Sequence, residues 1–262
     1  MLQAIAHDDV TELRFTTRRS RSMGFQVSAF TLRGVLIDSG FPDCAGDLAR
    51  YAAARPLAGC VLTHYHEDHA GGAAVMARAG VPLWMDARTA GRVRSPKRIG
   101  FYRRYTWGSP APLGAFRPFA LPAPLACIAT PGHSDDHHVV WDTETGTVFG
   151  GDLFIGVKVR ISHVSEQPRQ LVQSLRRVVA LQPARYFDAH RGALAAPVEA
   201  LNAKADWLEK TIESIDALIV KGLDDATIAG RVLGRDWWNR TFTGGDYTMA
   251  NLVRAVRATA AT

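Results

Sequence analysis

A dense group of potential metal ligands follows one short apolar segment, and no other feature constrains the fold as strongly. His64, His66, Asp68 and His69 lie within six residues, directly after the apolar run 60–62. Residues 71–77 then begin with two glycines, which is typical of a turn that enters a helix. A strand that ends in a tight loop can aim several side chains at one point. The spacing therefore predicts a site for a divalent metal that favours imidazole nitrogen, completed by carboxylate oxygen.

Four further segments occur in an order that is typical of one family. Asp38 follows the apolar run 35–37, and His133 lies in the polar segment 130–137. Asp152 follows two glycines after a β-rich stretch, and His190 ends another short predicted strand. With the His-x-His-x-Asp-His pattern, these segments make the chain resemble the metallo-β-lactamase superfamily from about residue 25 to residue 192.

The resemblance implies an α/β fold, namely the αββα sandwich, and a site for two metals. It implies that His64, His66 and His133 hold one ion, that Asp68, His69 and His190 hold the second, and that Asp152 bridges them. Asp38 would support the metal loop without ligating. Residues 137 and 138 fall on a predicted strand, where one side chain points inward, and we expect His137 to support the site. We expect two Zn²⁺ ions, with Mn²⁺ or iron as alternatives.

Such a site predicts hydrolysis by a hydroxide that bridges two metals, with Asp68 as a catalytic group that orients the nucleophile or carries its proton. The pattern around Asp68 and Asp152 resembles the glyoxalase II, lactonase and lactamase-β-2-like branches, which favours an ester, thioester or lactone substrate. One alternative is a phosphodiesterase or ribonuclease of the same fold. A second is a persulfide dioxygenase-like enzyme with one iron, and a third is a non-catalytic binding or regulatory protein.

Length and composition agree with a soluble globular protein. The chain has 262 residues, of which 47% are hydrophobic and 21% charged. No apolar run approaches the roughly 20 residues of a membrane span, and the first residues do not resemble a signal peptide. Three widely spaced cysteines argue against a disulfide framework. We therefore expect a cytoplasmic protein without a membrane partner, whereas nothing in the sequence indicates its oligomeric state.

The order of predicted elements divides the chain at about residue 195. Residues 1–195 read as the sandwich, with a strand at 116–121 and a helix at 165–181 capped by Ser165. Residues 196–262 read as a helical extension that packs on it. An apolar stripe from Leu201 to Ile219 predicts its first helix, which Gly222 ends, and Asp224 or its neighbour caps a second. A third helix is expected at 248–258.

A basic segment is the best clue to the substrate. Residues 88–107 contain seven Arg or Lys residues and no acid, with aromatic residues interleaved. Arg98, Arg103 and Arg104 are the expected rim of the metal cleft, and Ser95, Pro96 and Gly100 argue against one continuous helix. A rim of this kind suits an anionic small molecule, with a nucleic acid strand less favoured. The alternative is a solvated basic surface on a chain of net charge +6.

Overall fold

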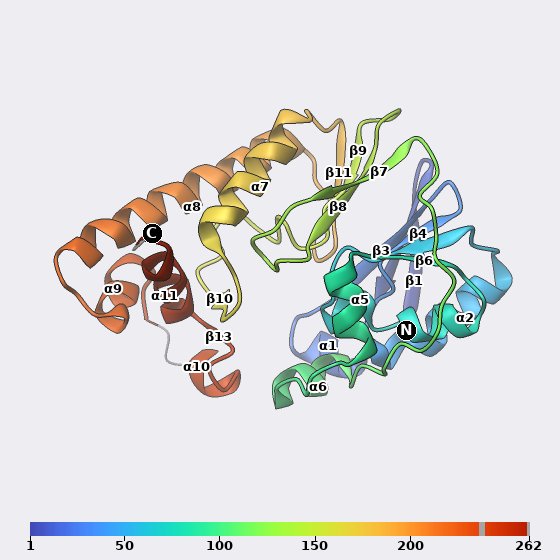
Figure 1. The fold of residues 1–262 in the computed structure, drawn as a ribbon, viewed down its shortest axis with the longest axis horizontal. Helices are drawn as coiled ribbons and strands as arrows, with labels where there is room; N and C mark the ends of the chain where they lie inside the picture. The colour runs from blue at the N-terminus through green and yellow to red at the C-terminus, as the bar shows by residue number, and fades with distance from the viewer. Residues whose placement is uncertain (236–238, 261–262) are drawn as a thin grey trace.

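The computed structural model describes residues 1–235 and 239–260, and two β-sheets dominate it (Figure 1). A 6-stranded sheet has the order β1-β2-β3-β4-β5-β6, and a 5-stranded sheet has the order β12-β11-β9-β8-β7. The first sheet consists of β1 (Leu2–His7), β2 (Val10–Phe15), β3 (Val27–Leu32), β4 (Val35–Ile37), β5 (Gly59–Val61) and β6 (Leu83–Trp84). The second consists of β7 (Leu125–Ala129), β8 (His138–Asp142), β9 (Thr147–Phe149), β11 (Arg185–Asp188) and β12 (Gly192–Ala193). A short ribbon pairs β10 (Ser162–His163) with β13 (Tyr247–Thr248).

Helices cover the outer face of each sheet. Those of the first half are α1 (Arg18–Ser22), a 3₁₀ turn (Pro42–Cys44), α2 (Ala45–Ala54), α3 (Glu67–Ala70), α4 (Ala73–Arg78), α5 (Ala87–Arg94) and α6 (Phe101–Trp107). Those of the second half are α7 (Pro168–Ala180), α8 (Pro197–Val220), α9 (Asp225–Val232), α10 (Asn239–Phe242) and α11 (Met249–Ala260). Within the described ranges, no helix is both long and apolar enough to cross a membrane.

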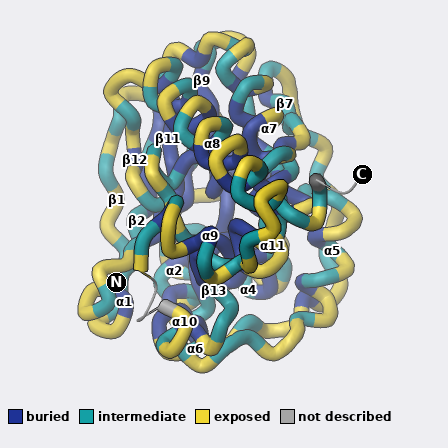
Figure 2. The backbone as a smooth tube through the Cα atoms, turned by 90° about the vertical axis from the view of Figure 1, so that its left-hand side faces the viewer, coloured by how far each residue is buried: buried dark blue, intermediate teal, exposed yellow. Residues whose placement is uncertain are grey.

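Three hydrophobic clusters separate the four layers. Phe30, Phe149 and Phe187 lie at the centre of the cluster between the sheets. A second cluster joins the first sheet to α2 and α4, and a third joins the second sheet to α7, α8, α9 and α11. In Figure 2, α8 alternates between buried and exposed residues, as an amphipathic helix does when it lies on a sheet. The predicted αββα sandwich is confirmed.

The C-terminal helices continue the core of the sandwich. Leu208 and Ile212 of α8 share one buried cluster with Leu175 of α7 and Val148 of β9. Helix α8 ends at Val220, Gly222 adopts a positive φ of 74°, and Asp224 caps α9 by accepting hydrogen bonds from two backbone N–H groups. These helix ends are those predicted from the sequence. The division at residue 195 stays a prediction, although one hydrophobic cluster extends across it.

Two local predictions are wrong. Residues 116–121 form no strand, and their pairing with β6 is limited to an isolated bridge between Leu83 and Pro118. Two hydrogen bonds hold this bridge, one from the Leu83 N–H to the carbonyl oxygen of Arg117 and one from the Phe119 N–H to the carbonyl oxygen of Leu83. Ser165 does not cap α7, because that helix begins at Pro168 and Ser165 instead bonds the ring of His163.

Parallel pairing places the metal-ligand segments at one edge of the two sheets. Strands β4 and β5 pair in parallel, so Asp38 and the loop from Thr63 leave the first sheet side by side. Strands β9 and β11 also pair in parallel, which places Asp152 and His190 at the same end of the second sheet. Strand β8 runs antiparallel to β9, so the segment that precedes it, with His133 and His137, reaches that edge as well. Chain segments far apart in sequence therefore meet there.

Candidate metal centre

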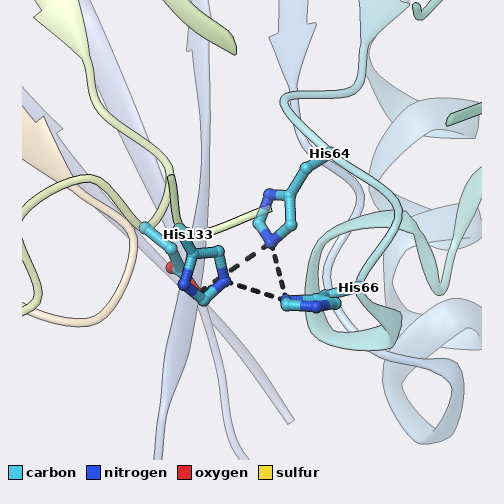
Figure 3. Close-up of side chains that lie close together, drawn as sticks. His64, His66 and His133 are labelled. Atoms are coloured by element: carbon cyan, nitrogen blue, oxygen red, sulfur yellow. Dashed lines mark hydrogen bonds and ion pairs between the residues drawn. The ribbon is translucent and has the colours of Figure 1, made fainter. Parts of the chain in front are cut away.

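The first group of side chains consists of His64, His66, His133 and Asp152, all buried, with one potential ligand atom from each within 4.8 Å of the others. Nδ1 of His66 lies 3.0 Å from Nε2 of His64 and 2.9 Å from Nε2 of His133. Oδ2 of Asp152 lies 3.3 Å from the same His133 nitrogen. Figure 3 shows the three rings converging from opposite sides on one point. Three nitrogens and a carboxylate oxygen are a donor set that suits Zn²⁺.

The second group consists of Asp68, His69 and His190, whose potential ligand atoms also lie within 4.8 Å of one another. Nε2 of His190 lies 3.5 Å from Oδ2 of Asp68 and 3.2 Å from Oδ1 of Asp152. Nε2 of His69 lies 3.1 Å from the same Asp152 oxygen. The two oxygens of Asp152 therefore face different groups, as a bridging carboxylate requires.

Contacts outside the two groups fix which nitrogen of each ring carries the proton. Nδ1 of His69 lies 2.8 Å from a carboxylate oxygen of Asp38, and Nδ1 of His190 lies 2.8 Å from the carbonyl oxygen of Gln26. Nδ1 of His133 likewise contacts the carboxylate of Glu166. Each of these acceptors takes a proton from Nδ1, so Nε2 is the nitrogen that faces the centre and that would bind a metal after losing any proton of its own.

The ring of His64 is oriented by the same network. The hydroxyl of Thr63 donates to Asp38 and lies 3.0 Å from Nδ1 of His64. Because the hydroxyl proton is already given to Asp38, its oxygen accepts from His64. The lone pair of His64 Nε2 then points into the centre as well.

Charge and burial also favour a cation at this point. Burial lowers the pKa of His64 and of His66 well below the usual histidine range, so both rings are neutral. Burial also acts to lower the pKa of His190, but the carboxylates of Asp152 and Asp68 raise it to about 9. Burial opposes it, but the carboxylates of Asp152, Asp38 and Asp68 also raise the pKa of His69. Buried imidazoles and carboxylates thus converge on one point, and this nitrogen-rich donor set fits divalent metals.

Asp38 and His137 lie behind the ligands. Asp38 has a positive φ of 62° and accepts from the backbone N–H of Thr63 as well as from His69. His137 accepts from the backbone N–H of Asp152 through Nε2, and its Nδ1 contacts Thr130. His137 therefore orients the loop that carries Asp152 rather than joining the ligand set.

Two supporting carboxylates were not identified from the sequence. Glu166 contacts His133 from 33 residues away, and no local pattern indicates that contact. Asp188 accepts from the backbone N–H groups of Ile155 and His190, which ties the loop after Asp152 to the loop that carries His190. Its place at the end of β11, two residues before a predicted ligand, is a signal that could have indicated its role.

The basic segment does not form one exposed rim. Arg103 is buried and forms two hydrogen bonds with the carboxylate of Glu67, which lies between two predicted metal ligands. Although burial opposes it, this carboxylate raises the pKa of Arg103, whereas burial raises the pKa of Glu67 against the opposing effect of Arg103. Arg98 and Arg104 instead line a separate cavity of about 850 Å³, and Arg103 lies at its wall. The predicted break in the helix is confirmed, since α5 ends at Arg94 and α6 begins at Phe101.

A cleft of about 350 Å³ lies over the predicted metal ligands. Its polar floor includes His66, Asp68, His133, Asp152 and His190, whereas its walls are mainly apolar and aromatic. The wall residues include Phe25, Trp107, Ile155, Val159, Ile161 and Tyr247. The cleft therefore offers both a reactive floor and space for an apolar group.

Residues 24–190 match the family model of the metallo-beta-lactamase superfamily. The chain belongs to the metallo-beta-lactamase superfamily. This match spans every residue of the two metal-ligand groups, and it confirms the family predicted from the sequence motifs.

Two relatives in this superfamily are named beta-lactamase-like protein 2 homologs. The protein from Drosophila melanogaster is 27% identical over 209 residues, which cover 71% of this chain and 68% of the relative. The protein from Caenorhabditis elegans is 23% identical over 222 residues, which cover 76% of this chain and 65% of the relative. The matched region thus spans about two thirds of the length of each relative.

Solved structures of the superfamily share the fold at low sequence identity. A metallo-beta-lactamase family protein from Thermus thermophilus superposes with a TM-score of 0.67 at 18% identity, covering 96% of this chain and 94% of its own. A metallo-beta-lactamase from Pseudomonas aeruginosa in its mono-zinc form has a TM-score of 0.61 at 18% identity, covering 80% and 95%. The Thermus likeness therefore extends into the C-terminal helices.

Asp38→Asn is expected to weaken metal binding without unfolding the chain. The amide can replace only one of the acceptor oxygens that orient Thr63 and His69, and loss of such an outer contact lowers metal affinity about 10- to 100-fold. Competition with a chromogenic chelator measures this affinity. The matched control is Asp142→Asn, because Asp142 is equally buried but pairs with Arg33 at the opposite end of β8. Equal affinities in wild type and Asp38→Asn would contradict the supporting role.

Proposed function

We propose that this protein is a metal-dependent hydrolase that cleaves esters or thioesters with an apolar acyl group. The observation that carries the proposal is the apolar cleft directly over the two ligand groups. His64, His66, His133 and Asp152 would hold one metal, and Asp68, His69, His190 and Asp152 the other. When bound, two such ions lower the pKa of a water molecule and polarise the carbonyl that it attacks.

Asp68 has the position of a group that orients the attacking water. Its side chain is 11% exposed and lines the cleft, whereas His64 and His69 are fully buried beneath it. A carboxylate oxygen at the surface of the floor can accept a hydrogen bond from a water molecule. This bond orients the water so that the lone pair of the water oxygen points at a substrate carbonyl. Asp68 then also receives the proton that the water loses.

Tyr102 also lines the cleft and carries a hydrogen-bond donor. Its hydroxyl oxygen is buried and has no partner among the described residues. Burial raises the pKa of this hydroxyl, so it keeps its proton at neutral pH. A substrate oxygen that enters the cleft would satisfy this donor, while the aromatic walls exclude bulk water from the reacting bond.

A substrate panel on the metal-loaded protein tests the proposal. We expect hydrolysis of acyl esters and thioesters, with kcat/KM rising as the acyl chain lengthens from acetyl to hexanoyl, because each methylene buries apolar surface. Bis-aryl phosphates, lactones, a β-lactam and glutathione persulfide complete the panel. Faster turnover of the phosphodiester or of the persulfide than of every ester and thioester would refute the proposal and assign one of the other activities of this fold.

A further inference from the structure

A second cavity lies beside the metal cleft and is separate from its apolar walls. It measures about 850 Å³ and is formed by α5, α6 and the loop between them. Arg103 lines both cavities, so the two are neighbours across one side chain. A concave site of this size falls within the range of about 300–1,000 Å³ in which proteins bind small molecules.

This cavity carries positive charge that its own residues do not neutralise. Arg103 is paired with Glu67, and Arg92 is paired with Asp135. The wall also holds the carboxylate of Asp246, but among the described residues no ion pair joins a carboxylate to the remaining cations, which are Lys97, Arg98 and Arg104. Five cations of the wall thus face two carboxylates, those of Glu67 and Asp246. The cavity therefore attracts anions.

Arg104 provides an independent sign of a missing anionic ligand. Its Nε atom is buried and finds no hydrogen-bond acceptor among the described residues. A buried donor without an acceptor is costly, and an oxyanion in the cavity would satisfy it. Guanidinium groups match the oxygens of phosphate in geometry as well as in charge.

We propose that the basic cavity binds the phosphate groups of a thioester substrate whose leaving thiol is phosphate-bearing. This inference rests on the proposed thioester hydrolysis. The acyl group would occupy the apolar cleft, the thioester would lie over Asp68, and the thiol would extend past Arg103 to Lys97 and Arg98. Hydrolysis adds one water across the carbon–sulfur bond and releases a carboxylic acid and a free thiol. The cations line a concave, partly open pocket, and a concavity of this size suits a small molecule better than a nucleic acid strand.

Binding of adenosine diphosphate to the metal-loaded protein tests the cavity without turnover. The double variant Lys97→Ala/Arg98→Ala removes two cations of the wall, and Arg88→Ala/Arg94→Ala removes two cations of the same segment outside it. We expect calorimetry to show affinity about tenfold weaker in the first variant and within about twofold of wild type in the second, with the difference shrinking at high salt. Equal affinities in both variants would overturn the proposal.

Kinetics with a matched pair of thioesters separates this inference from the proposed function. Butyryl coenzyme A and butyryl N-acetylcysteamine share the acyl group and the thioester, but only the first carries phosphates. We expect Lys97→Ala/Arg98→Ala to raise KM for the first about tenfold and to leave the second unchanged. Cleavage of both thioesters with unchanged KM would refute the subsite and leave the hydrolase proposal standing. If neither is cleaved, the hydrolase proposal fails, and nucleotide binding alone decides the anion site. A single-stranded RNA that binds more tightly than adenosine diphosphate, and that Lys97→Ala/Arg98→Ala weakens, would overturn the inference in favour of a nucleic acid ligand.

Discussion

Asp152→Ala is expected to abolish hydrolysis and to weaken binding at both metal positions. The two carboxylate oxygens of Asp152 face different ligand groups, Oδ2 toward His133 and Oδ1 toward His69 and His190. Without this charge, nothing between the two positions offsets the repulsion of two cations. Because metal-ion catalysis supplies several kcal/mol, we expect kcat to fall at least about 10³-fold. Elemental analysis after dialysis, together with steady-state kinetics, measures both effects.

Asp135→Ala is the matched control for that variant. Asp135 lies in a predicted ligand segment, close to His133 in sequence, but its side chain is 55% exposed and pairs with Arg92. We expect this variant to retain both metals and to lose less than about threefold in kcat, since exposed ion pairs contribute little. Full metal occupancy in Asp152→Ala would show that this residue does not bridge.

Arg103→Leu is expected to destabilise the protein strongly, even when it is free of metal. The substitution leaves the carboxylate of Glu67 buried without its partner, and breaking a buried pair in this way costs about 3–5 kcal/mol. For a chain of this size, we expect a fall in Tm of about 10 °C or more. Calorimetric scans of the metal-free protein measure the effect apart from any change in metal affinity.

Two further variants separate pairing from a general loss of charge. Arg98→Ala removes an exposed cation of the same segment, and we expect its Tm to lie within about 1 °C of wild type. Glu67→Gln/Arg103→Leu removes both charges, and we expect it to be more stable than Arg103→Leu alone. The single variant Glu67→Gln completes the comparison. If the loss of stability in the double variant equalled the sum of the losses in Glu67→Gln and Arg103→Leu, the pair would not be a coupled unit.

The sandwich fold and the edge that carries the site could be predicted from the sequence, because the predicted ligands follow directly after short strands. Asp38, Asp152 and His190 each follow a short strand, so the edge at which they meet was predictable. Strand β1 was not recognised, since none of its residues is buried and they show no clean alternation of apolar and polar side chains. It depends on pairing with β2 across the turn at Asp8, a tertiary effect that composition does not reveal.

Long-range contacts within the site escaped prediction for the same reason. Lys204 of α8 is buried and donates to the carbonyl oxygens of Leu153 and Phe154, just after Asp152. Nothing in the apolar stripe of that helix indicates such a contact. The pairing of Arg103 with Glu67 was equally hidden, because a run of basic residues predicts a solvated surface rather than one buried side chain. Ligand identity depends on local spacing, whereas these supporting contacts depend on how distant elements pack.

Titration of metal-free protein with Zn²⁺ tests the central claim most directly, with bound metal per chain and thioester hydrolysis followed on the same samples. Two groups of ligand atoms share the carboxylate of Asp152, so we predict two equivalents of tightly bound zinc and activity that reaches its maximum only as the second is bound. Binding that saturates at a single equivalent of metal, without thioester cleavage in the zinc-loaded protein, would contradict a binuclear hydrolase. Full persulfide dioxygenase activity with one bound iron would then favour the mono-iron alternative.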